Sequence, residues 1–236
     1  KAVRDPIIKY LQEIGWNYIE PEECIELRRT VSELFLLPVL RQKIRELNKG
    51  VIETDEQVDE VIKKLRNVRA NLAGNQEFLQ YLRGEKTIYI EKERRELNIK
   101  LIDFEHPEQN EYHVTKEFEF SDIKPDRTDT ALFINGIPIM IIETKSPSEE
   151  DPVGKAYGQI KRYHEEMPEL MKAVQLFALS EGIVLKYGPT WDLNRRNVHK
   201  WKVDEQVDLE KLIKDFFPKP KILRLLEDCT VFFTKD

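Results

Sequence analysis

Residues 129–145 read Asp129-Thr-Ala-Leu-Phe-Ile-Asn-Gly-Ile-Pro-Ile-Met-Ile-Ile-Glu143-Thr-Lys145, and this stretch decides the fold. Two apolar strands flank Asn135-Gly136, whose residue types are those that tolerate a tight turn. Four consecutive apolar residues, 139–142, indicate that the second strand is buried on both faces. A buried strand that ends in Glu143 and Lys145 brings charge to a sheet edge, where charge is costly unless it is paired or used.

The rest of the chain predicts a mixed sheet with flanking helices, an α/β or α+β fold. After Gly84 the sequence is rich in Ile, Val, Phe and Tyr between Gly, Pro and Asn, which is typical of strands. Helices are predicted over 154–170 and 208–216. The predicted strands are 87–90, 98–104, 111–120, 130–134, 139–145, 173–180 and 182–187, the last of them at an edge.

Residues 1–83 are predicted to form a helical segment that packs on the sheet. Apolar side chains recur there at helical spacing. The stripe over 32–47 is interrupted by Pro38, which predicts a kinked helix or two segments. Thr54, with a Gln three residues later, forms a capping box, and Asn75 is a candidate cap of a further helix.

The chain has 236 residues, 40% hydrophobic and 35% charged, which fits one large or two small globular domains. A net charge of −6 argues against a protein that coats DNA through overall positive charge, but not against a nuclease with a local basic surface. The longest apolar run is short of the ~20 residues of a membrane helix, and no secretory signal opens the chain. Two distant cysteines fit a reducing compartment, so we expect a cytoplasmic protein without membrane contact.

Glu143 and Lys145 lie two residues apart on a strand and therefore point to the same face. One interpretation is an exposed strand end where the two side chains simply pair, because Glu-x-Lys alone is common. The other is phosphodiester hydrolysis, in which carboxylates hold a hard cation such as Mg²⁺ and a lysine orients water or stabilises charge on the phosphate. An upstream Asp followed by Glu-x-Lys supplies the parts that the second interpretation needs.

This combination resembles the PD-(D/E)xK nuclease motif as it occurs in the restriction (HsdR) subunit of type I restriction–modification enzymes. That family has an Asp, an apolar strand with F-x-N-G-x-P, and a second apolar strand that ends in E-x-K. The same order is present here from Asp129 through Phe133 and Pro138 to Lys145. Gln159-Ile-Lys-Arg-Tyr163 resembles the family's QxxxY element, and the resemblance covers nearly the whole chain.

The resemblance implies a PD-(D/E)xK restriction-endonuclease-like fold, with 84–217 as the nuclease core and 218–236 as a linker toward a missing motor domain. It implies Mg²⁺-dependent cleavage of double-stranded DNA without sequence specificity of its own. ATP would serve only the full-length subunit, and modification and specificity subunits would be its partners. The site residues that it implies are Asp129 and Glu143 as metal ligands, Lys145 to position water, and Gln159 and Tyr163 as supporting residues.

One departure from the family's pattern leaves the first ligand open. The family usually has Pro directly before its Asp, whereas Pro125-Asp126 lies three residues before Asp129. A two-residue loop at Asn135-Gly136 would place Asp129 on the face opposite Glu143. We predict instead a three-residue loop with a bulge, which puts Asp129 on the face of Glu143, and we keep Asp126 as the alternative ligand.

Several further residues are weaker candidates. Lys161 and Arg162 share the helix of the QxxxY element and are possible phosphate contacts. Glu77, on the helix before the sheet, is a candidate acid only because related nucleases often use one from such a helix.

The stretch 186–202 holds the best local excess of Lys and Arg, with tryptophans interleaved. Arg195, Arg196 and Lys200 are therefore candidate DNA contacts. An equal alternative is a solvated loop whose tryptophans are anchored in the core. Two other functions stay open as well: a non-catalytic DNA-binding or docking module of the same fold, and a nuclease from another restriction or repair system.

Overall fold

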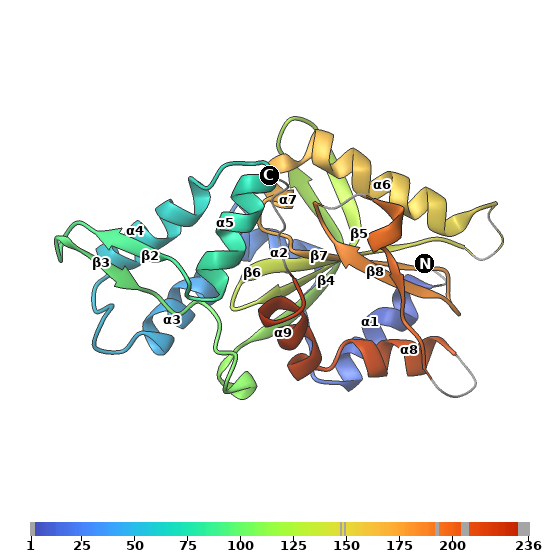
Figure 1. Cartoon of the computed structure of the whole chain (residues 1–236), viewed down its shortest axis with the longest axis horizontal. Helices are drawn as coiled ribbons and strands as arrows, with labels where there is room; N and C mark the ends of the chain where they lie inside the picture. The colour runs from blue at the N-terminus through green and yellow to red at the C-terminus, as the bar shows by residue number, and fades with distance from the viewer. Residues whose placement is uncertain (1–2, 147, 149, 192–193, 204–207, 231–236) are drawn as a thin grey trace.

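In the computed structural model of the chain, one mixed sheet has the strand order β1-β4-β5-β6-β7-β8-β9 (Figure 1). The structure describes residues 3–146, 148, 150–191, 194–203 and 208–230. β5 is antiparallel to both of its neighbours, β4 and β6, whereas β1 and β4, and β6 and β7, are parallel pairs. The strands are β1 Asn17–Tyr18, β4 Tyr112–Ser121, β5 Pro125–Ile134, β6 Ile137–Thr144, β7 Leu176–Ser180, β8 Leu185–Pro189 and β9 His199–Lys200.

The predicted helical character of the N-terminal segment is confirmed in the part that the structure describes. The capping box is present, since the Thr54 side chain accepts from the Gln57 amide and the Gln57 side chain accepts from the Thr54 amide. It opens the longest of these helices. The helices are α1 Arg4–Glu13, α2 Pro21–Arg28, α3 Leu37–Leu47, α4 Asp55–Arg66 and α5 Leu72–Leu82.

Two helix starts differ from the prediction. The helix expected over 32–47 begins only one residue before Pro38, because proline is tolerated in the first turn of a helix and not in its interior. Asn71 caps α5, so the expectation that Asn75 does so is wrong. Asn75 is buried instead, and its amide donates to three backbone oxygens within 171–174, which ties α5 to the chain that enters β7.

The strand expected over 98–104 is also wrong. Only Asn98 of that range is a strand residue, as the last residue of β3 (Arg95–Asn98), which pairs with β2 (Thr87–Ile90) in a separate two-stranded sheet. β8 is not at the edge, because β9 pairs with its outer side. Asp208 caps the predicted helix α8 (Leu209–Phe216).

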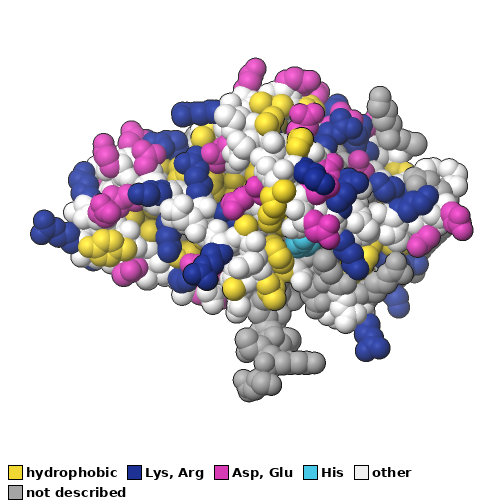
Figure 2. All heavy atoms as spheres, turned by 90° about the horizontal axis from the view of Figure 1, so that it is seen from above, with side chains coloured by type: hydrophobic (Ala, Val, Ile, Leu, Met, Phe, Trp, Pro, Cys, Tyr) yellow, Lys and Arg dark blue, Asp and Glu magenta, His cyan; other side chains and the backbone are white. Residues whose placement is uncertain are grey.

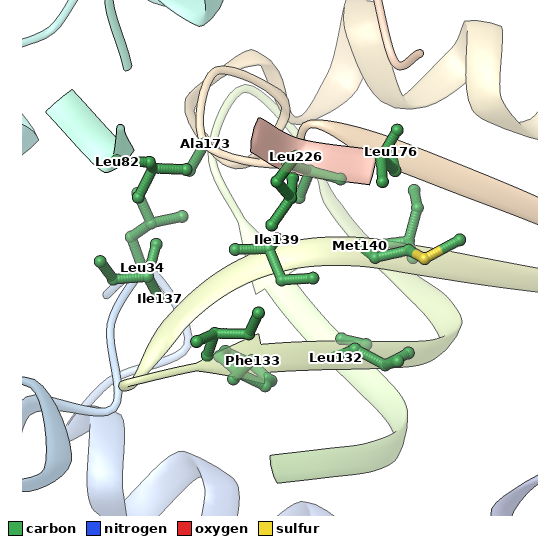
Figure 3. Close-up of a cluster of buried hydrophobic side chains, with 14 of the residues drawn as sticks. Leu34, Leu82, Leu132, Phe133, Ile137, Ile139, Met140, Ala173, Leu176 and Leu226 are labelled. Carbon is green, nitrogen blue, oxygen red and sulfur yellow. The ribbon is translucent and has the colours of Figure 1, made fainter. Parts of the chain in front are cut away.

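The segment expected to be a linker, 218–236, begins as a packed helix in the part that is described. α9 (Lys219–Glu227) buries Ile222, Leu223 and Leu226, and the Arg83 guanidinium donates to the backbone oxygen of Leu226. Figure 3 places Leu226 in the same buried cluster as side chains from β5, β6 and α5. Residues 231–236 lie outside the described part of the chain.

The turn between β5 and β6 contains two residues, Asn135 and Gly136, so the predicted three-residue loop is wrong. Both have left-handed backbone, with φ of 52° and 80°, the geometry of the type I′ turn that Asn-Gly favours. The Asn135 side chain accepts from the Glu111 amide and donates to the Leu101 oxygen and the Asn110 side chain. A Cβ on Gly136 would lie 2.7 Å from a backbone oxygen of the segment before α3.

A β-bulge in β6, and not a longer turn, shifts the pairing of β5 with β6 by one residue. The pairing shifts by one residue between Leu132 and Phe133 of β5, which leaves Ile139 of β6 as the extra residue. Beyond the bulge, Thr130 pairs with Ile142. The residues that precede and follow this pair, Asp129 and Glu143, therefore share one face of the sheet.

Helices cover both faces of the sheet around β6. α6 (Pro152–Glu166) and α7 (Pro168–Met171) connect the parallel strands β6 and β7 and lie on one side, while α1 and α8 lie on the other (Figure 1). β6 is buried from Ile137 to Glu143, as its apolar run predicts, and its Ile139 lies in one cluster with Leu82 and Leu226 (Figure 3). Among the described helices, none has both the length and the apolar composition to cross a membrane.

Candidate active site at the end of β6

A cleft of about 580 Å³ opens where β6 ends. Strands β4 and β5, the end of β6, and helix α6 all contribute to its wall. Four of the residues that the sequence predicts for the site meet here although they are far apart in the chain. The lining residues are Val31, Glu119, Phe120, Ser121, Pro125, Asp126, Arg127, Asp129, Glu143, Lys145 and Gln159.

Asp129 on β5 is oriented by Thr144 at the end of β6. Asp129 Oδ2 accepts hydrogen bonds from both the amide and the hydroxyl of Thr144, each at 2.8 Å. The Asp129 amide in turn donates to Oε1 of Glu143 at 3.1 Å. These bonds hold the two carboxylates side by side, while no described residue donates a hydrogen bond to Oδ1 of Asp129.

Glu143 is a carboxyl group in an environment that disfavours its charge. The side chain is buried, with 1% of its surface exposed. Burial raises the pKa of Glu143 to about 8, and the negative charge of Asp129 adds to the rise, while hydrogen bonds from Tyr163 and the Asp129 amide and the charge of Lys145 oppose it. The raised pKa means that the negative charge of ionised Glu143 is unfavourable in this environment. A cation in the cleft would therefore stabilise the ionised form.

Tyr163 and Gln159 of α6 form a hydrogen-bonded chain to Glu143. The Tyr163 hydroxyl lies 2.8 Å from Oε1 of Glu143 and 2.9 Å from the backbone oxygen of Arg127, and Gln159 Nε2 donates to it at 3.0 Å. Burial and the nearby Glu143 carboxylate hold the pKa of Tyr163 well above its ordinary value, so its hydroxyl keeps the proton that it donates. The two α6 residues thus meet at the site, as their i, i+4 spacing allows.

Lys145 completes the cleft from the strand end. Its side chain is half-buried and lines the same cleft as Glu143, in keeping with strand alternation. The Lys145 amide donates to the backbone oxygen of Ser180 at the end of β7, which fixes the strand end in the sheet. The lysine charge also lowers the pKa of Glu143 against the effect of burial.

The donor set fits a hard cation. Oε1 of Glu143 and Oδ2 of Asp129 each accept two hydrogen bonds, so the carboxylates are anchored through one oxygen. The other oxygens, Oδ1 and Oε2, accept no hydrogen bond from the described residues and remain for a ligand. Carboxylate oxygens are the ligands that Mg²⁺ prefers, with water completing the shell. In the described part of the chain, no three His, Cys, Asp or Glu side chains are grouped as a full metal site.

Asp126, the alternative ligand, also lines the cleft but is committed to other partners. Its Oδ2 accepts from Nε and Nη2 of Arg162 at 3.1 and 2.8 Å, and its Oδ1 accepts from the Arg127 amide. Arg162 pairs with Glu166 as well, so this predicted phosphate contact is held by two carboxylates. The contacts therefore favour Asp129 over Asp126 as a metal ligand.

The structure does not bring Glu77 to the cleft. Its carboxylate accepts from Lys86 and Tyr81 and lies 4.0 Å from Lys64. These partners lower the pKa of Glu77 against the opposing effect of burial. Glu77 is not among the lining residues of the cleft, so the analogy with a helix acid is not supported by its position.

The basic stretch 186–202 lies apart from the cleft lining. Arg196 and Lys200 are exposed, and Arg195 begins a short 3-10 turn, although its side chain is outside what the structure describes. The tryptophans serve the packing: Trp191 donates to the backbone oxygen of Met171, and Trp201 packs in an edge contact against Phe216. These contacts favour the interpretation of a solvated loop with anchored tryptophans.

Thr144 and Arg127 are site residues that sequence reasoning missed. Strand alternation assigns Thr144 to the face opposite Glu143, so spacing carried no signal that it would bond to Asp129. Arg127 lies in the predicted motif region, but nothing in its spacing marks it; it lines the cleft, and its backbone oxygen accepts a hydrogen bond from the Tyr163 hydroxyl. Figure 2 shows basic and acidic side chains interspersed over the face that it views, so charge alone does not mark a binding face.

The fold and the cleft define an α/β protein whose mixed sheet presents two carboxylates and a lysine at one strand end. Residues 1–194 match the family described as "Type I restriction enzyme R protein N terminus", and the chain belongs to this family. The predicted relation to the restriction (HsdR) subunit of type I enzymes is thereby confirmed.

Known relatives agree with this membership. The chain is 30% identical over 243 residues to the MjaVIIIP endonuclease subunit of Methanocaldococcus jannaschii, which carries the name of a type I restriction enzyme; the match covers 99% of this chain and 23% of the relative. It is 27% identical over 211 residues to the type I restriction enzyme HindI endonuclease subunit of Haemophilus influenzae, over 84% of this chain and 20% of the relative. The chain thus spans about a quarter or less of each of these proteins.

Proposed function

We propose that this chain is the endonuclease part of a type I restriction subunit, with a PD-(D/E)xK core that hydrolyses double-stranded DNA in a Mg²⁺-dependent reaction. The observation that carries the proposal is the pair of half-anchored carboxylates, Asp129 and Glu143, beside Lys145 in one cleft. A buried Glu with a raised pKa next to a second carboxylate is unfavourable in a purely structural site, and a bound cation offsets that cost.

Each residue has a definite task in this mechanism. Asp129 and Glu143 would hold Mg²⁺, which would supply positive charge to polarise the phosphate and to make the attacking water more acidic. Lys145 orients the attacking water and stabilises negative charge on the phosphate. The water oxygen forms a bond to phosphorus, one bridging P–O bond breaks, and the proton lost by water balances the one gained by the leaving oxygen. Tyr163 keeps Glu143 in place by hydrogen bonding to it, and Gln159 donates to the Tyr163 hydroxyl in turn.

Family membership supports a proposal for the wider function. The relatives are named as restriction enzyme endonuclease subunits, and the chain covers only a part of each. We infer that the complete subunit includes an ATP-dependent motor and assembles with modification and specificity subunits. In that assembly the partners choose the DNA sequence, and this chain cuts without a sequence preference of its own.

A cleavage assay of the assembled enzyme tests the proposal. Glu143→Ala and Lys145→Ala should each abolish DNA cleavage, while ATP hydrolysis, measured in parallel, should stay at the wild-type rate. Retained cleavage in either variant would contradict the mechanism. Glu77→Ala is the matched control for loss of an acidic residue outside the cleft, and it should cut normally.

A non-catalytic docking module of the same fold is the second candidate. Under it, titration of the chain with Mg²⁺ or Mn²⁺ would show no binding that depends on Asp129 and Glu143. The hydrogen bonds at these two residues favour the catalytic alternative. The Asp129 amide and Thr144 occupy one oxygen of each carboxylate, and the other oxygens, in two residues that line one cleft, accept no bond from the described residues.

A further inference from the structure

Gly158 lies in the middle of α6 on its exposed side, and the described structure contains no contact that requires glycine there. A Cβ built on Gly158 would meet no heavy atom within 4 Å. Glycine in a helix interior destabilises the helix relative to alanine. The unfolded chain has more backbone conformations at glycine, so more conformational entropy is lost on folding. Gly158 therefore has a stability cost without a structural reason in the described part of the chain.

Gly154, one turn earlier on the same helix, provides a contrast. A Cβ on Gly154 would lie 1.9 Å from Oδ2 of Asp151, the residue whose side chain caps α6. Gly154 is thus explained by the cap of its own helix. The backbone at Gly158, by contrast, is accessible to a ligand or partner molecule.

The surroundings of Gly158 indicate what could approach it. Arg162, one turn after Gly158 and therefore on the same face of α6, bonds to Asp126, which lines the cleft, so this face borders the candidate active site. Positions three or four residues from Gly158 are its neighbours on the helix surface, and three of them are Lys155, Lys161 and Arg162. Lys161 is exposed, and its Nζ lies 5.3 Å from the centroid of the Tyr157 ring.

We propose that the face of α6 around Gly158 is the surface on which the sugar-phosphate backbone of double-stranded DNA lies as it enters the cleft. This inference rests on the proposed nuclease function. A phosphodiester chain can approach the helix backbone closely only where no Cβ projects, and glycine is the residue that allows such an approach. Lys161 contacts a phosphate beside it, whereas Arg162 is already paired with Asp126 and Glu166 and holds the adjoining wall of the cleft.

Substitution of Gly158 separates this proposal from a purely structural role, because stability and cleavage should change in opposite directions. Gly158→Ala should raise the Tm by about 2 °C, since alanine is the better helix former. Gly158→Leu should lower the rate of DNA cleavage by the assembled enzyme at least about tenfold through steric displacement of the DNA, with ATP hydrolysis unchanged. The Tm of Gly158→Leu is measured as well, and it should not fall below that of the wild type, because leucine is also a better helix former than glycine; slower cutting by this variant then cannot come from a folding defect.

Lys161→Ala should lower cleavage as well, with a deficit that narrows as salt is raised, because a phosphate contact is screened by salt. Lys9→Ala is the matched control: it removes an exposed lysine from α1, on the other side of the sheet, and should leave cleavage unchanged (Figure 1). Wild-type cleavage by Gly158→Leu would overturn the α6 surface. A changed oligomeric state with unchanged cleavage would overturn it too, in favour of a protein contact.

The two proposals fail in distinguishable ways. If cleavage survives Glu143→Ala, the nuclease function itself is wrong. If cleavage is lost in Glu143→Ala but normal in Gly158→Leu, the nuclease function stands and the DNA surface on α6 is wrong.

Discussion

The two ends of the β5–β6 hairpin contain similar polar residues in opposite states. At the turn, the Asn135 side chain is buried and makes a hydrogen bond through each of its polar groups. At the other end, Asp129 and Glu143 are each anchored through one oxygen only. A fully satisfied buried polar group stabilises a fold, whereas a half-satisfied buried carboxyl has a cost that a ligand can offset. The same hairpin therefore has a structural end and a chemical end.

The largest effect is expected at the chemical end, where activity and stability should separate. Glu143→Gln should abolish cleavage, since an amide cannot supply the charge that holds the cation. The same variant should be more stable than the wild type in EDTA at alkaline pH. The folded-state pKa of Glu143 is raised from 4.5 to about 8, so its favourable contribution is present below pH 4.5 and is lost as the pH rises through 8.

The size of this stability difference can be measured by urea unfolding across the pH range. The variant should gain roughly 2–5 kcal/mol over the wild type by pH 9 and almost nothing at pH 4.5. A difference that is independent of pH would contradict the assignment of a proton to Glu143 in the folded, cation-free protein.

The next largest effect is expected at the structural end. Asn135→Ala should lower the free energy of unfolding by about 3 kcal/mol, because the Glu111 amide and the Leu101 oxygen lose their partner and the left-handed backbone at 135 becomes less favourable. Cleavage per folded molecule should not change. Asn98→Ala is the control, since Asn98 makes one exposed hydrogen bond to Gly84 and should cost less than about 1 kcal/mol.

A smaller effect is expected where Thr144 joins Asp129 to the strand end. Thr144→Val keeps the shape but removes the hydroxyl donor to Oδ2 of Asp129, and should reduce cleavage by about tenfold to a hundredfold. The Mg²⁺ concentration that gives half-maximal cleavage should rise as well, which a general loss of stability would not produce. Thr144→Ser should restore both quantities. If Val and Ser behave alike, the hydroxyl does not position Asp129.

The smallest effect is expected away from the hairpin. Arg196→Ala and Lys200→Ala should change cleavage by less than about twofold, because both residues are exposed and remote from the cleft lining, and isolated surface charges contribute little. Lys145→Ala, tested beside them, shows the scale of losing a lysine inside the cleft. A large loss of cleavage in Arg196→Ala or Lys200→Ala would support the alternative that 186–202 contacts DNA.

For the β5–β6 hairpin, the sequence predicted which residues share a face but not the turn and bulge that bring this about. The requirement that Asp129 and Glu143 share a face was correct as a constraint on geometry, but the odd residue was assigned to the turn. Asn135-Gly136 by itself indicates a two-residue turn, and Pro138 within the strand was the sign of an irregularity, because proline in a sheet is found at edges and bulges. The exact position of a bulge depends on packing against α3 and α6, which periodicity does not contain.

Other successes and failures have the same physical origin. The capping box at Thr54 was predictable because both partners lie within one helical turn. Asn75 was assigned as a cap because its residue type suits caps, but its partners are backbone oxygens almost a hundred residues away. In the candidate site, residue types and strand alternation predicted Glu143 and Lys145, whereas the Thr144 contact and the Asp126–Arg162 pair depend on tertiary geometry.

The bulge at Ile139 has a consequence for how this hairpin can evolve. Substitutions among 139–142 that keep apolar character preserve the register of the sheet, so the identity of these residues can vary. Loss of a single residue from the same run would turn Glu143 to the other face while leaving hydrophobic content almost unchanged. The number of residues between Asp129 and Glu143 is therefore constrained more tightly than their identity, and a second change, such as a residue lost from β5 or gained in the turn, would be needed to restore the alignment.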